Sequence, residues 1–503
     1  MLTNLITLLL VLASLLIGGA LALLGNPHLG CAMMLAAVAA AGLLRVSRIR
    51  DALSLWSRWL TPFLIGAAAG AALVLLATTS SFAPGIGSAI ARPAASLSED
   101  YRLLSLFGKV FDIVRADYVD KPDDAKLISS AISGMVDGLD PHSNYMDAKS
   151  FNDMQVDTNG RFGGLGMEVT MTDGLVKVVS PIDNTPAAKA GILAGDVITQ
   201  VDDQPIKGMA LDLVVAKLRG PVGSKVKLQV TRKDLAAPLN FTLTREVIKI
   251  QSVKDHAEGT DVGYIRITQF NDLTTDELKA ALKDLATKIP EAQVKGYVLD
   301  LRNNPGGLLD QAVSVSDAFL NRGEVVSIRG RSPGDSERFD AKSGDLIHGK
   351  RLIVLINGGT ASAAEIVSGA LQDHKRATIL GTRSFGKGSV QTIIPLGEGN
   401  GALRLTTARY YTPSGRSIQA QGITPDIRVV EDVPKDVADR IGEVSEASLR
   451  GHLKATGAEE KGSQAYVPPD EKDDKALQTA LALLRGTQTN PAFPADRTQA
   501  RAN

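Results

Sequence analysis

The sequence contains a single cysteine, Cys31, among its 503 residues. One thiol cannot form a disulfide within the chain, so the fold does not depend on one, and a paired-cysteine metal or redox site is excluded. The six histidines are scattered along the chain and show neither HExxH nor another spacing typical of metal ligands. We therefore expect no metal and no other cofactor.

The chain also lacks an excess of charge of either sign, since it has 55 basic and 55 acidic residues. Because no basic field is available, we expect no nucleic-acid partner. No internal repeat is evident in the sequence. The length is too great for one ordinary hydrophobic core, so two or three domains are expected.

Three long apolar runs are present near the N-terminus, at residues 5–24, 29–44 and 60–77. Each is close to the length that crosses a bilayer. The loop between the second and third runs carries four arginines, and the positive-inside rule places such a loop in the cytoplasm. This predicts a bacterial inner-membrane protein whose remaining residues lie in the periplasm. In the alternative interpretation, residues 45–83 are a cleaved signal peptide that exports the same soluble part.

The most informative stretch is NGGTASAAEIVSGALQ at residues 357–372, which follows the apolar run RLIVLI. The run predicts a buried strand, and the alanine-rich stretch predicts a helix that leaves it through a glycine turn. Ser362 would then lie in the first helical turn, where free N–H groups favour negative charge. An acyl-transfer nucleophile needs such a setting. The alternative is a strand-to-helix turn whose small residues serve packing.

A second motif, TRSFGKGSVQ, contains Lys387 and, four residues later, Gln391. A serine nucleophile needs a base, and a lysine can serve when burial lowers its pKa toward neutrality. The separation from Ser362, 387 − 362 = 25 residues, allows a helix and a strand to fold back. The glycines on either side of the lysine allow close approach of the backbone.

Seven motifs in fixed order give the chain a specific family resemblance between about residues 101 and 430. They are LDPHSNYM, GGLGMEV, LDLRNNPGG, NGGTASAAE, GTRSFGKGSVQ, YYTPSGRSIQ and GITPDI. With them the chain resembles the carboxy-terminal processing proteases, which are serine endopeptidases with a Ser–Lys dyad and an inserted PDZ domain. The resemblance implies a crotonase-like ββα core.

By this resemblance, each site residue has an expected role. Ser362 is the nucleophile, Lys387 the general base and Gln391 the residue that orients the lysine. The backbone of Gly306 or Gly307, together with that of Ala363, would form the oxyanion hole.

Residues 162–246 have the order of elements expected of a PDZ domain, and helix 211–218 would line its peptide groove. The loop Gly164, Leu165, Gly166 and Met167 offers N–H groups for a terminal carboxylate beside a strand edge. Taken alone, GLGM is also compatible with an ordinary glycine loop. In combination with AGILAGDVI it indicates recognition of protein C-termini that are free and apolar.

The predicted fold class is therefore α/β multidomain: a ββα protease core with an inserted PDZ domain, preceded by N-terminal transmembrane helices. The predicted segments are membrane segments at 1–82, a linker at 83–98, an N-terminal helical part of the protease at 99–155, a PDZ domain at 160–247, a Ser–Lys core at 248–430 and a helical or disordered tail at 431–503.

Two other functions are compatible with parts of the sequence, namely a catalytically silent PDZ scaffold and a crotonase-fold acyl-CoA enzyme. The intact Ser362, Lys387 and Gln391 argue against the first, and the PDZ insertion and export segments argue against the second. His374, beside Asp373, is a rival base for a serine triad, although the helix would place it far from Ser362. An adaptor protein and a homo-oligomer are possible further partners.

Overall fold

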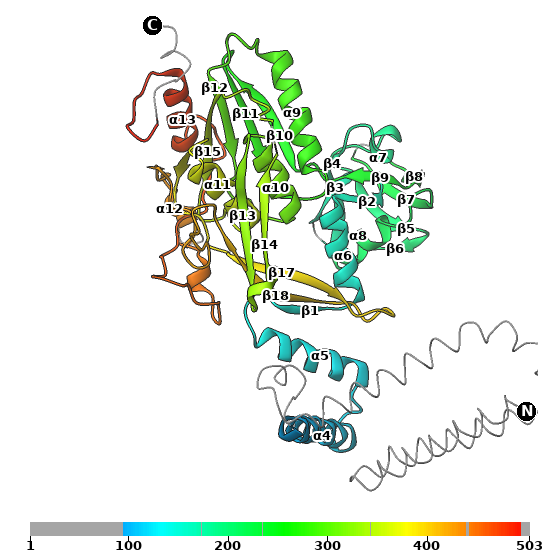
Figure 1. The fold of residues 1–503 in the computed structure, drawn as a ribbon. Helices are drawn as coiled ribbons and strands as arrows, with labels where there is room; N and C mark the ends of the chain where they lie inside the picture. Colours follow the sequence, from blue (N-terminus) through cyan, green and yellow to red (C-terminus); the bar gives the residue numbers. More distant parts are fainter. Residues whose placement is uncertain (1–93, 173, 234, 343, 439–441, 494–503) are drawn as a thin grey trace, which may run out of the picture. The chain divides into compact units, whose positions relative to one another are not determined.

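The computed structural model describes residues 94–493, except residues 173, 234, 343 and 439–441 (Figure 1). The chain divides into two compact units, Met1–Lys121 and Pro122–Asn503. The described part of the first unit contains helix α4 (Ala94–Asp117). The second unit contains all the other elements named below.

The predicted fold class is corrected in one respect. No helix within the described part of the chain is long and apolar enough to cross a membrane. Although α4 has 24 residues, charged side chains recur along it from Glu99 to Asp117. The three apolar runs on which the prediction of transmembrane helices rested lie at residues 5–77, outside the described residues.

The centre of the second unit is a six-stranded sheet with the order β10-β11-β12-β15-β16-β19. All neighbouring pairs are parallel except β10 with β11. The strands are β10 (Val253–Glu258), β11 (Val262–Ile267), β12 (Gly296–Asp300), β15 (Arg351–Ile356), β16 (Thr378–Gly381) and β19 (Ile427–Arg428). The predicted strand RLIVLI is β15, at the predicted bounds.

Both faces of this sheet are covered, which explains why its central strands, such as β15, are almost continuously apolar. Helices α9 (Thr274–Lys288), α10 (Leu309–Asp317) and α11 (Ala363–Asp373) contribute to the largest buried cluster together with Leu299 and Val354. Helix α13 (Lys475–Arg485) packs with the alternate residues Val298 and Ile353 in a separate cluster. Figure 1 shows α13 on the other side of the strands from α9 and α10.

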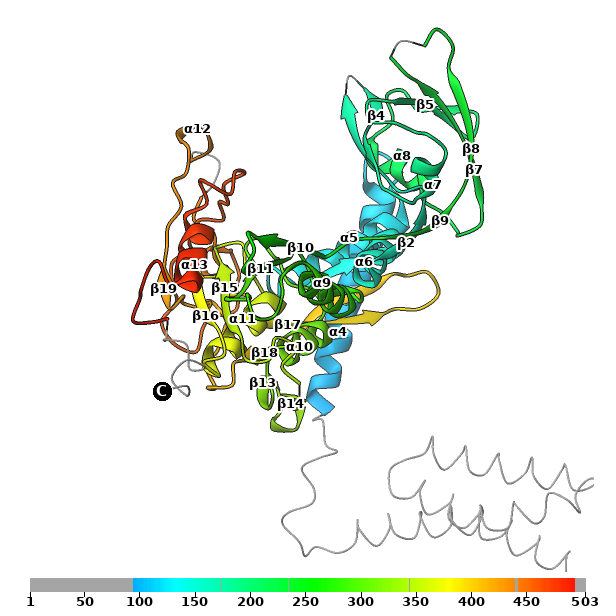
Figure 2. The same cartoon turned by 90° about the horizontal axis from the view of Figure 1, so that it is seen from above.

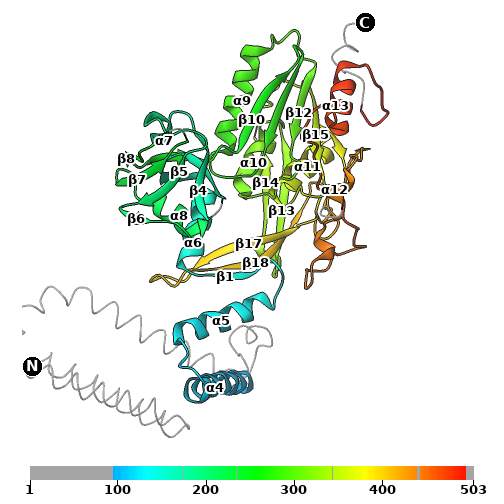
Figure 3. The ribbon, with the colours of Figure 1, turned by 180° about the vertical axis from the view of Figure 1, so that it is seen from behind.

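A second, antiparallel sheet joins segments that are far apart in the sequence (Figure 3). Its order is β1-β18-β13-β14, and β17 also pairs with β18. The strands are β1 (Asn144–Met146), β13 (Gly323–Gly330), β14 (Ser336–Ala341), β17 (Ser389–Pro395) and β18 (Ala402–Tyr411). Residues 332–349 are polar and contain glycines, a composition that predicts a surface loop, but Ser336–Ala341 form strand β14. Because β14 is an edge strand with mostly exposed side chains, its polar composition hid its pairing with β13.

The predicted PDZ segment has its own sheet, with the order β3-β4-β5-β7-β8, and its own buried apolar cluster. Figure 2 shows helices α7 and α8 among these strands. The elements are β3 (Met167–Thr172), β4 (Leu175–Pro181), α7 (Pro186–Lys189), β5 (Val197–Val201), β6 (Gln204–Pro205), α8 (Leu211–Leu218), β7 (Lys225–Thr231) and β8 (Leu239–Thr244). A two-stranded ribbon of β2 (Arg161–Gly164) and β9 (Glu246–Lys249) lies at the ends of this segment.

Three further helices and two 3₁₀ turns complete the elements of the second unit. They are α5 (Asp124–Asp137), α6 (Ala148–Asn159), α12 (Lys435–Ala438), η1 (Pro333–Asp335) and η2 (Glu446–Ser448).

The described part of residues 431–503, which the sequence assigned to a helical or disordered tail, is bonded closely to the core. Besides α13, an extended stretch reaches the turn before Ser362, where the Gly358 N–H donates to the Gln464 carbonyl at 2.9 Å. A Cβ on Gly358 would meet the Ser463 carbonyl oxygen at 2.0 Å. This contact therefore requires glycine at position 358.

Candidate active site

Ser362 lies at the corner between β15 and α11, as the sequence predicted. It is the residue directly before α11, with φ 54° and ψ −118°, a backbone conformation that is costly for any residue with a Cβ. Its side chain is largely buried, since only 8% of the residue's surface is exposed. The neighbouring loop contacts this corner closely, because a Cβ on Gly306 would lie 2.7 Å from that of Ser362.

Glu365, one turn into α11, is fully buried and binds the backbone on both sides of the predicted dyad. Its Oε2 accepts hydrogen bonds from the N–H groups of Ser362 at 2.8 Å and Lys387 at 2.9 Å. Its Oε1 accepts from the Gly386 N–H at 2.7 Å and the Ser384 hydroxyl at 2.5 Å. Burial raises the pKa of this carboxyl to about 7, although the four hydrogen bonds oppose the shift. One carboxylate thus fixes the spacing between the two loops.

Lys387 lies in the loop between β16 and β17 and is half-buried. Burial lowers the pKa of its amine, and the positive charge of Arg404 lowers it further. Three carboxylates oppose this shift, in decreasing order Glu446, Glu365 and Asp140. The direction is the one that a lysine base requires, because only the neutral amine can accept a proton.

Gln391 lies in β17, and its amide nitrogen has two hydrogen-bond acceptors, one on the same strand and one on β18. The amide nitrogen donates to the hydroxyl groups of Ser389 at 2.9 Å and Thr406 at 3.2 Å. The Thr406 hydroxyl in turn donates to Asp140 at 3.0 Å. The side chain is therefore held beside the lysine loop, and its orientation of the Lys387 amine stays a prediction.

The loop after β12 brings Gly306 and Gly307 to the Ser362 turn, with φ of 99° and 142°. The Gly306 N–H donates to the Asn304 side chain at 2.9 Å, so this donor is already used. A Cβ on Gly306 would lie 2.9 Å from the Ala363 nitrogen. As the first residue of α11, Ala363 has an N–H that no helical carbonyl can accept. The N–H groups of Ala363 and Gly307 thus stay the predicted oxyanion donors, whereas the Gly306 N–H already has an acceptor.

The rival base, His374, lies at the opposite end of α11 from Ser362, directly after Asp373. Its Nε2 is 2.7 Å from the Glu324 carbonyl oxygen. Asp373 accepts a hydrogen bond from the Ser414 N–H instead of contacting the histidine. A helix of 11 residues separates its ends by roughly 16 Å, so this arrangement cannot form a triad with Ser362.

In the PDZ segment, Leu165 is buried in the local core and Gly166 has φ 74°. The Gly166 carbonyl accepts from the Ile182 N–H and the Thr185 hydroxyl, each at 2.9 Å. The carbonyl groups of this loop are thus directed into the domain. The following strand, β3, is an edge strand of its sheet, so one side of it is open to pairing with a peptide.

Comparison with known proteins identifies the family. Residues 261–429 match peptidase family S41, residues 163–257 match the PDZ domain, and residues 65–150 match the N-terminal domain of the activating protease CtpB. The carboxy-terminal-processing protease of Bartonella bacilliformis is 58% identical over 398 residues, which cover 79% of this chain and 91% of that protein. This chain belongs to the carboxy-terminal processing proteases. It is a serine-type peptidase with a PDZ domain.

More distant relatives match the same part of the chain. The carboxy-terminal processing protease CtpA of Bacillus subtilis is 35% identical, over 71% of this chain and 74% of that protein. Among solved structures, a photosystem II D1 C-terminal processing protease is 32% identical, with a TM-score of 0.38, over 66% of this chain and 95% of that chain.

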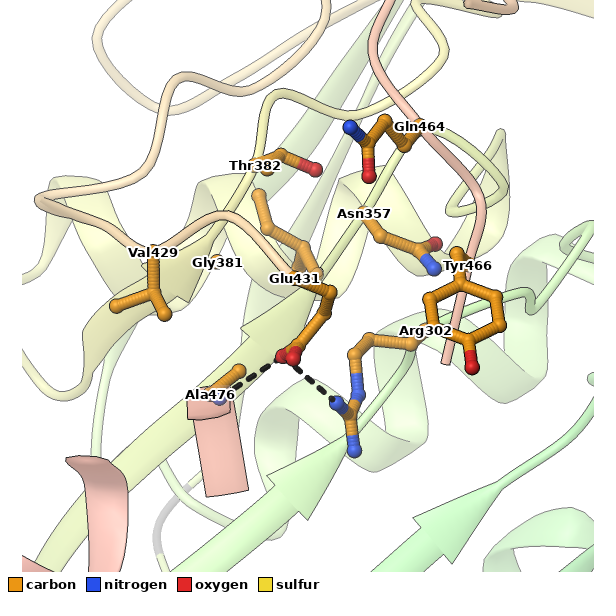
Figure 4. A pocket seen from close by; sticks show the side chains of 10 residues that line it. Arg302, Asn357, Gly381, Thr382, Val429, Glu431, Gln464, Tyr466 and Ala476 are labelled. Atoms are coloured by element: carbon orange, nitrogen blue, oxygen red, sulfur yellow. Dashed lines mark hydrogen bonds and ion pairs between the residues drawn. The ribbon is translucent and has the colours of Figure 1, made fainter. Parts of the chain in front are cut away.

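Several residues that surround the protease site were not singled out from the sequence. Arg302, which follows β12, is buried and forms ion pairs with Asp300 and Asp474, each at 2.7 Å. Figure 4 shows Arg302 beside Glu431, whose carboxylate also binds the N–H of Ala476. An arginine just after an apolar strand indicates that a buried carboxylate lies nearby to pair with it. Asp474 could not be recognised as such a partner, because it lies far from Arg302 in the sequence.

Glu446 is a second charged residue near the site that was not singled out from the sequence. It is fully buried, and its negative charge acts on Lys387 to raise the pKa of the lysine amine. The sequence offered no signal for it, because residues 433–456 contain several acids and no motif that singles out Glu446.

One group in the described part of the chain has the geometry of metal ligands. His256, Glu258 and Glu471 each offer a ligand atom, and these atoms lie within 4.8 Å of one another. Two of the three ligands lie on β10 and the third lies 213 residues later, 471 − 258 = 213, so sequence spacing could not show the group. None of the three belongs to the predicted protease site.

Proposed function

We propose that this protease cleaves proteins by an acyl-enzyme mechanism in which Ser362 is the nucleophile and Lys387 the general base. The observation that carries the proposal is the buried Glu365 carboxylate, which binds the N–H groups of both residues through one oxygen. The lowered pKa of Lys387 supports its role as the base.

In this mechanism the neutral Lys387 amine accepts the hydroxyl proton of Ser362 while the serine oxygen attacks the scissile carbonyl. The negative charge that develops on the carbonyl oxygen is stabilised by the N–H groups of Ala363 and Gly307. The Lys387 ammonium then returns the proton to the leaving amine, and the acyl-enzyme forms. Water, deprotonated by the same lysine, attacks the ester and releases the second product with Ser362 regenerated.

The dyad predicts a specific pattern among variants. Activity on an unfolded protein should rise with pH through the lowered pKa of Lys387, because the fraction of neutral amine rises. Lys387→Arg should be as inactive as Lys387→Ala, since a guanidinium does not deprotonate in this range. Ser362→Ala should lose at least about a thousandfold in kcat. His374→Ala is the matched control and should retain most activity. A Lys387→Ala enzyme that cleaves at the wild-type rate would exclude the dyad.

We also propose that the PDZ domain selects substrates by a free, apolar C-terminus. The open edge of β3 supports this, because a peptide can pair with it as an added strand. The side chains of Met167, Val169 and Met171 pack on the domain core from that strand and offer an apolar lining. The N–H groups of the loop Gly164–Met167 would bind the terminal carboxylate.

Recognition of the terminal carboxylate predicts that C-terminal amidation of a substrate peptide lowers its affinity for the PDZ domain. The carboxylate is the group that the loop N–H donors would bind, so a C-terminally amidated peptide should bind at least about tenfold more weakly. Isothermal titration of the full chain carrying Ser362→Ala measures this without cleavage. Equal affinity for the free and amidated forms would reject C-terminal recognition.

We propose in addition that the protease acts in the periplasm, exported by the apolar N-terminal segments and either retained at the inner membrane or released after cleavage. The four arginines before the third apolar run support export of the residues that follow. An adaptor and a homo-oligomer stay predictions.

A further inference from the structure

Glu446 begins the 3₁₀ turn η2, outside the stretch 261–429 that matches peptidase family S41. Although it is a carboxylate, none of its surface is exposed. A buried acid is costly unless its oxygens are hydrogen-bonded. Both oxygens of Glu446 have partners, and all of these partners belong to the surroundings of the predicted general base.

Three hydrogen bonds connect Glu446 to the loop on both sides of Lys387. The Glu446 N–H donates to the Phe385 carbonyl at 2.9 Å. Its Oε1 accepts from the Gln419 side-chain amide at 2.9 Å. The side-chain oxygen of Gln419, Oε1, in turn accepts a hydrogen bond from the Gly388 N–H at 3.1 Å. Of the two residues that flank Gly386 and Lys387, Phe385 is therefore bonded to the backbone of Glu446, and Gly388 is connected to the Glu446 side chain through Gln419.

The other oxygen of Glu446 extends the connection to the segment that supports Gln391. Glu446 Oε2 is 2.7 Å from His142 Nε2. The His142 N–H donates to Asp140 at 2.9 Å, and Asp140 accepts from the Thr406 hydroxyl. The Thr406 hydroxyl is also the acceptor of the Gln391 amide. This chain of bonds connects the lysine loop to the residue predicted to orient the lysine.

We propose that Glu446 is a positioning residue that holds the Lys387 loop against Gln419 and His142. This proposal rests on the assignment of Lys387 as the general base. It gives the C-terminal segment a part in the reaction, because without η2 the loop that carries the lysine loses its bond at Phe385, and Gln419, which binds Gly388, loses its bond to Glu446.

The charge of Glu446 has a second effect. The charged groups that act on Lys387 are Arg404 from β18, Glu446 from η2, Glu365 from α11 and Asp140. Arg404 favours the neutral amine, and the three carboxylates favour the ammonium. The ammonium is the form that appears when the lysine takes the serine proton, so a nearby carboxylate stabilises the charge that develops in that step.

These two effects can be separated by two substitutions in the full-length protease. Glu446→Gln keeps a side-chain oxygen that can accept the Gln419 bond but removes the negative charge. The acid limb of its kcat–pH profile should therefore move to lower pH, by about half a unit. Glu446→Ala removes the bonds to Gln419 and His142, so its kcat should fall about tenfold or more with little change in KM. Glu443 is an exposed acid of the same segment, so Glu443→Gln is the matched control. Its kcat–pH profile should be the same as that of the wild type.

The measurement is kcat and KM on an unfolded casein from pH 6 to 10, with circular dichroism at each pH. A Glu446→Ala variant that folds and keeps the wild-type kcat would overturn the positioning role, and so would a Glu446→Gln variant that does not fold, because the residue would then be purely structural. An unchanged acid limb in Glu446→Gln would overturn the effect of the charge. Lys387→Ala is measured in the same series. If Lys387→Ala retains activity, the dyad itself fails; if it is inactive while Glu446→Ala keeps the wild-type kcat, only the positioning role fails.

Discussion

At the scale of single residues, the state of Glu365 decides how the site is held together. Its carboxyl accepts four hydrogen bonds, and two of them come from the backbone of the predicted dyad. The ionised form can accept all four, because a carboxylate has enough lone pairs and no donor of its own. A protonated carboxyl must direct its hydrogen toward one of these donors, so the hydrogen bonds favour the ionised form, whereas burial of the side chain favours the protonated form and has the larger effect.

The raised pKa of Glu365 predicts how the stability of the protein depends on pH. A glutamate in an unfolded chain titrates near 4.3, whereas burial raises the folded value to about 7. Between these values the folded state binds the proton more tightly, so the free energy of unfolding should fall as the pH rises, and level off above pH 7. The loss should be about 3 kcal/mol over the window.

Urea denaturation of the wild type and of Glu365→Gln between pH 4.5 and 8 measures this contribution, because only the wild type has the titrating group. The difference in the free energy of unfolding between wild type and Glu365→Gln should change between pH 4.5 and 8. Glu337→Gln, an exposed substitution on β14, should show the same pH dependence of this free energy as the wild type. Parallel curves for wild type and Glu365→Gln would show that Glu365 does not titrate in this range.

At the scale of elements, α13 is attached to the core by a buried ion pair as well as by apolar packing. Asp474 precedes α13 and accepts the Leu477 N–H at 2.8 Å. The same carboxylate binds both terminal nitrogens of Arg302. The Asp474 side chain thus caps α13 and also pairs with the charge of the buried Arg302.

Asp474→Ala should therefore destabilise the protein by roughly 3 kcal/mol, because it leaves a buried cation with fewer partners and an open helix end. The midpoint of thermal unfolding measures the effect. Asp473→Ala, which changes the exposed neighbour, is the control and should unfold close to the wild type. Equal midpoints for the two variants would show that the pair with Arg302 does not hold α13.

The sequence predicted those elements whose periodicity matches their burial. The predicted strand RLIVLI has the bounds of β15, because a strand buried on both faces is continuously apolar. The apolar residues of 475–485 have the spacing of a helix with one apolar face, and α13 packs on the sheet with that face. Ser362 could be predicted because a glycine turn joins two such elements. The role of Glu446 could not, because its partners His142 and Gln419 lie 304 and 27 residues away and no local pattern records them.

At the scale of the whole molecule, the PDZ segment and the protease sheet have separate apolar clusters. A domain with its own core can be inserted without disrupting the host, provided that the ends of the insertion lie close together. The pairing of β2 with β9 satisfies this condition.

The proposed export of the catalytic part predicts where a reporter enzyme is active. Alkaline phosphatase needs disulfides, which form outside the cytoplasm, so a fusion after residue 98 should be active in bacterial cells. The same fusion without residues 1–77 should be inactive, because it lacks the three apolar runs. Phosphatase activity in intact cells is the readout, and an inactive full fusion present at normal level would contradict export.

The extended stretch beside Gly358 and the 3₁₀ turn at Glu446 are made late in translation, after the predicted catalytic residues. A ribosome that has reached residue 430 has made Ser362, Lys387 and the whole S41 match. It has not yet made Glu446, the Ser463–Gln464 contact or the Asp474 counter-ion. On the proposed role of Glu446, a chain that has not yet reached this residue hydrolyses peptides about tenfold or more slowly than the finished enzyme. The full rate is reached only after the C-terminal segment has been made and has folded onto the core.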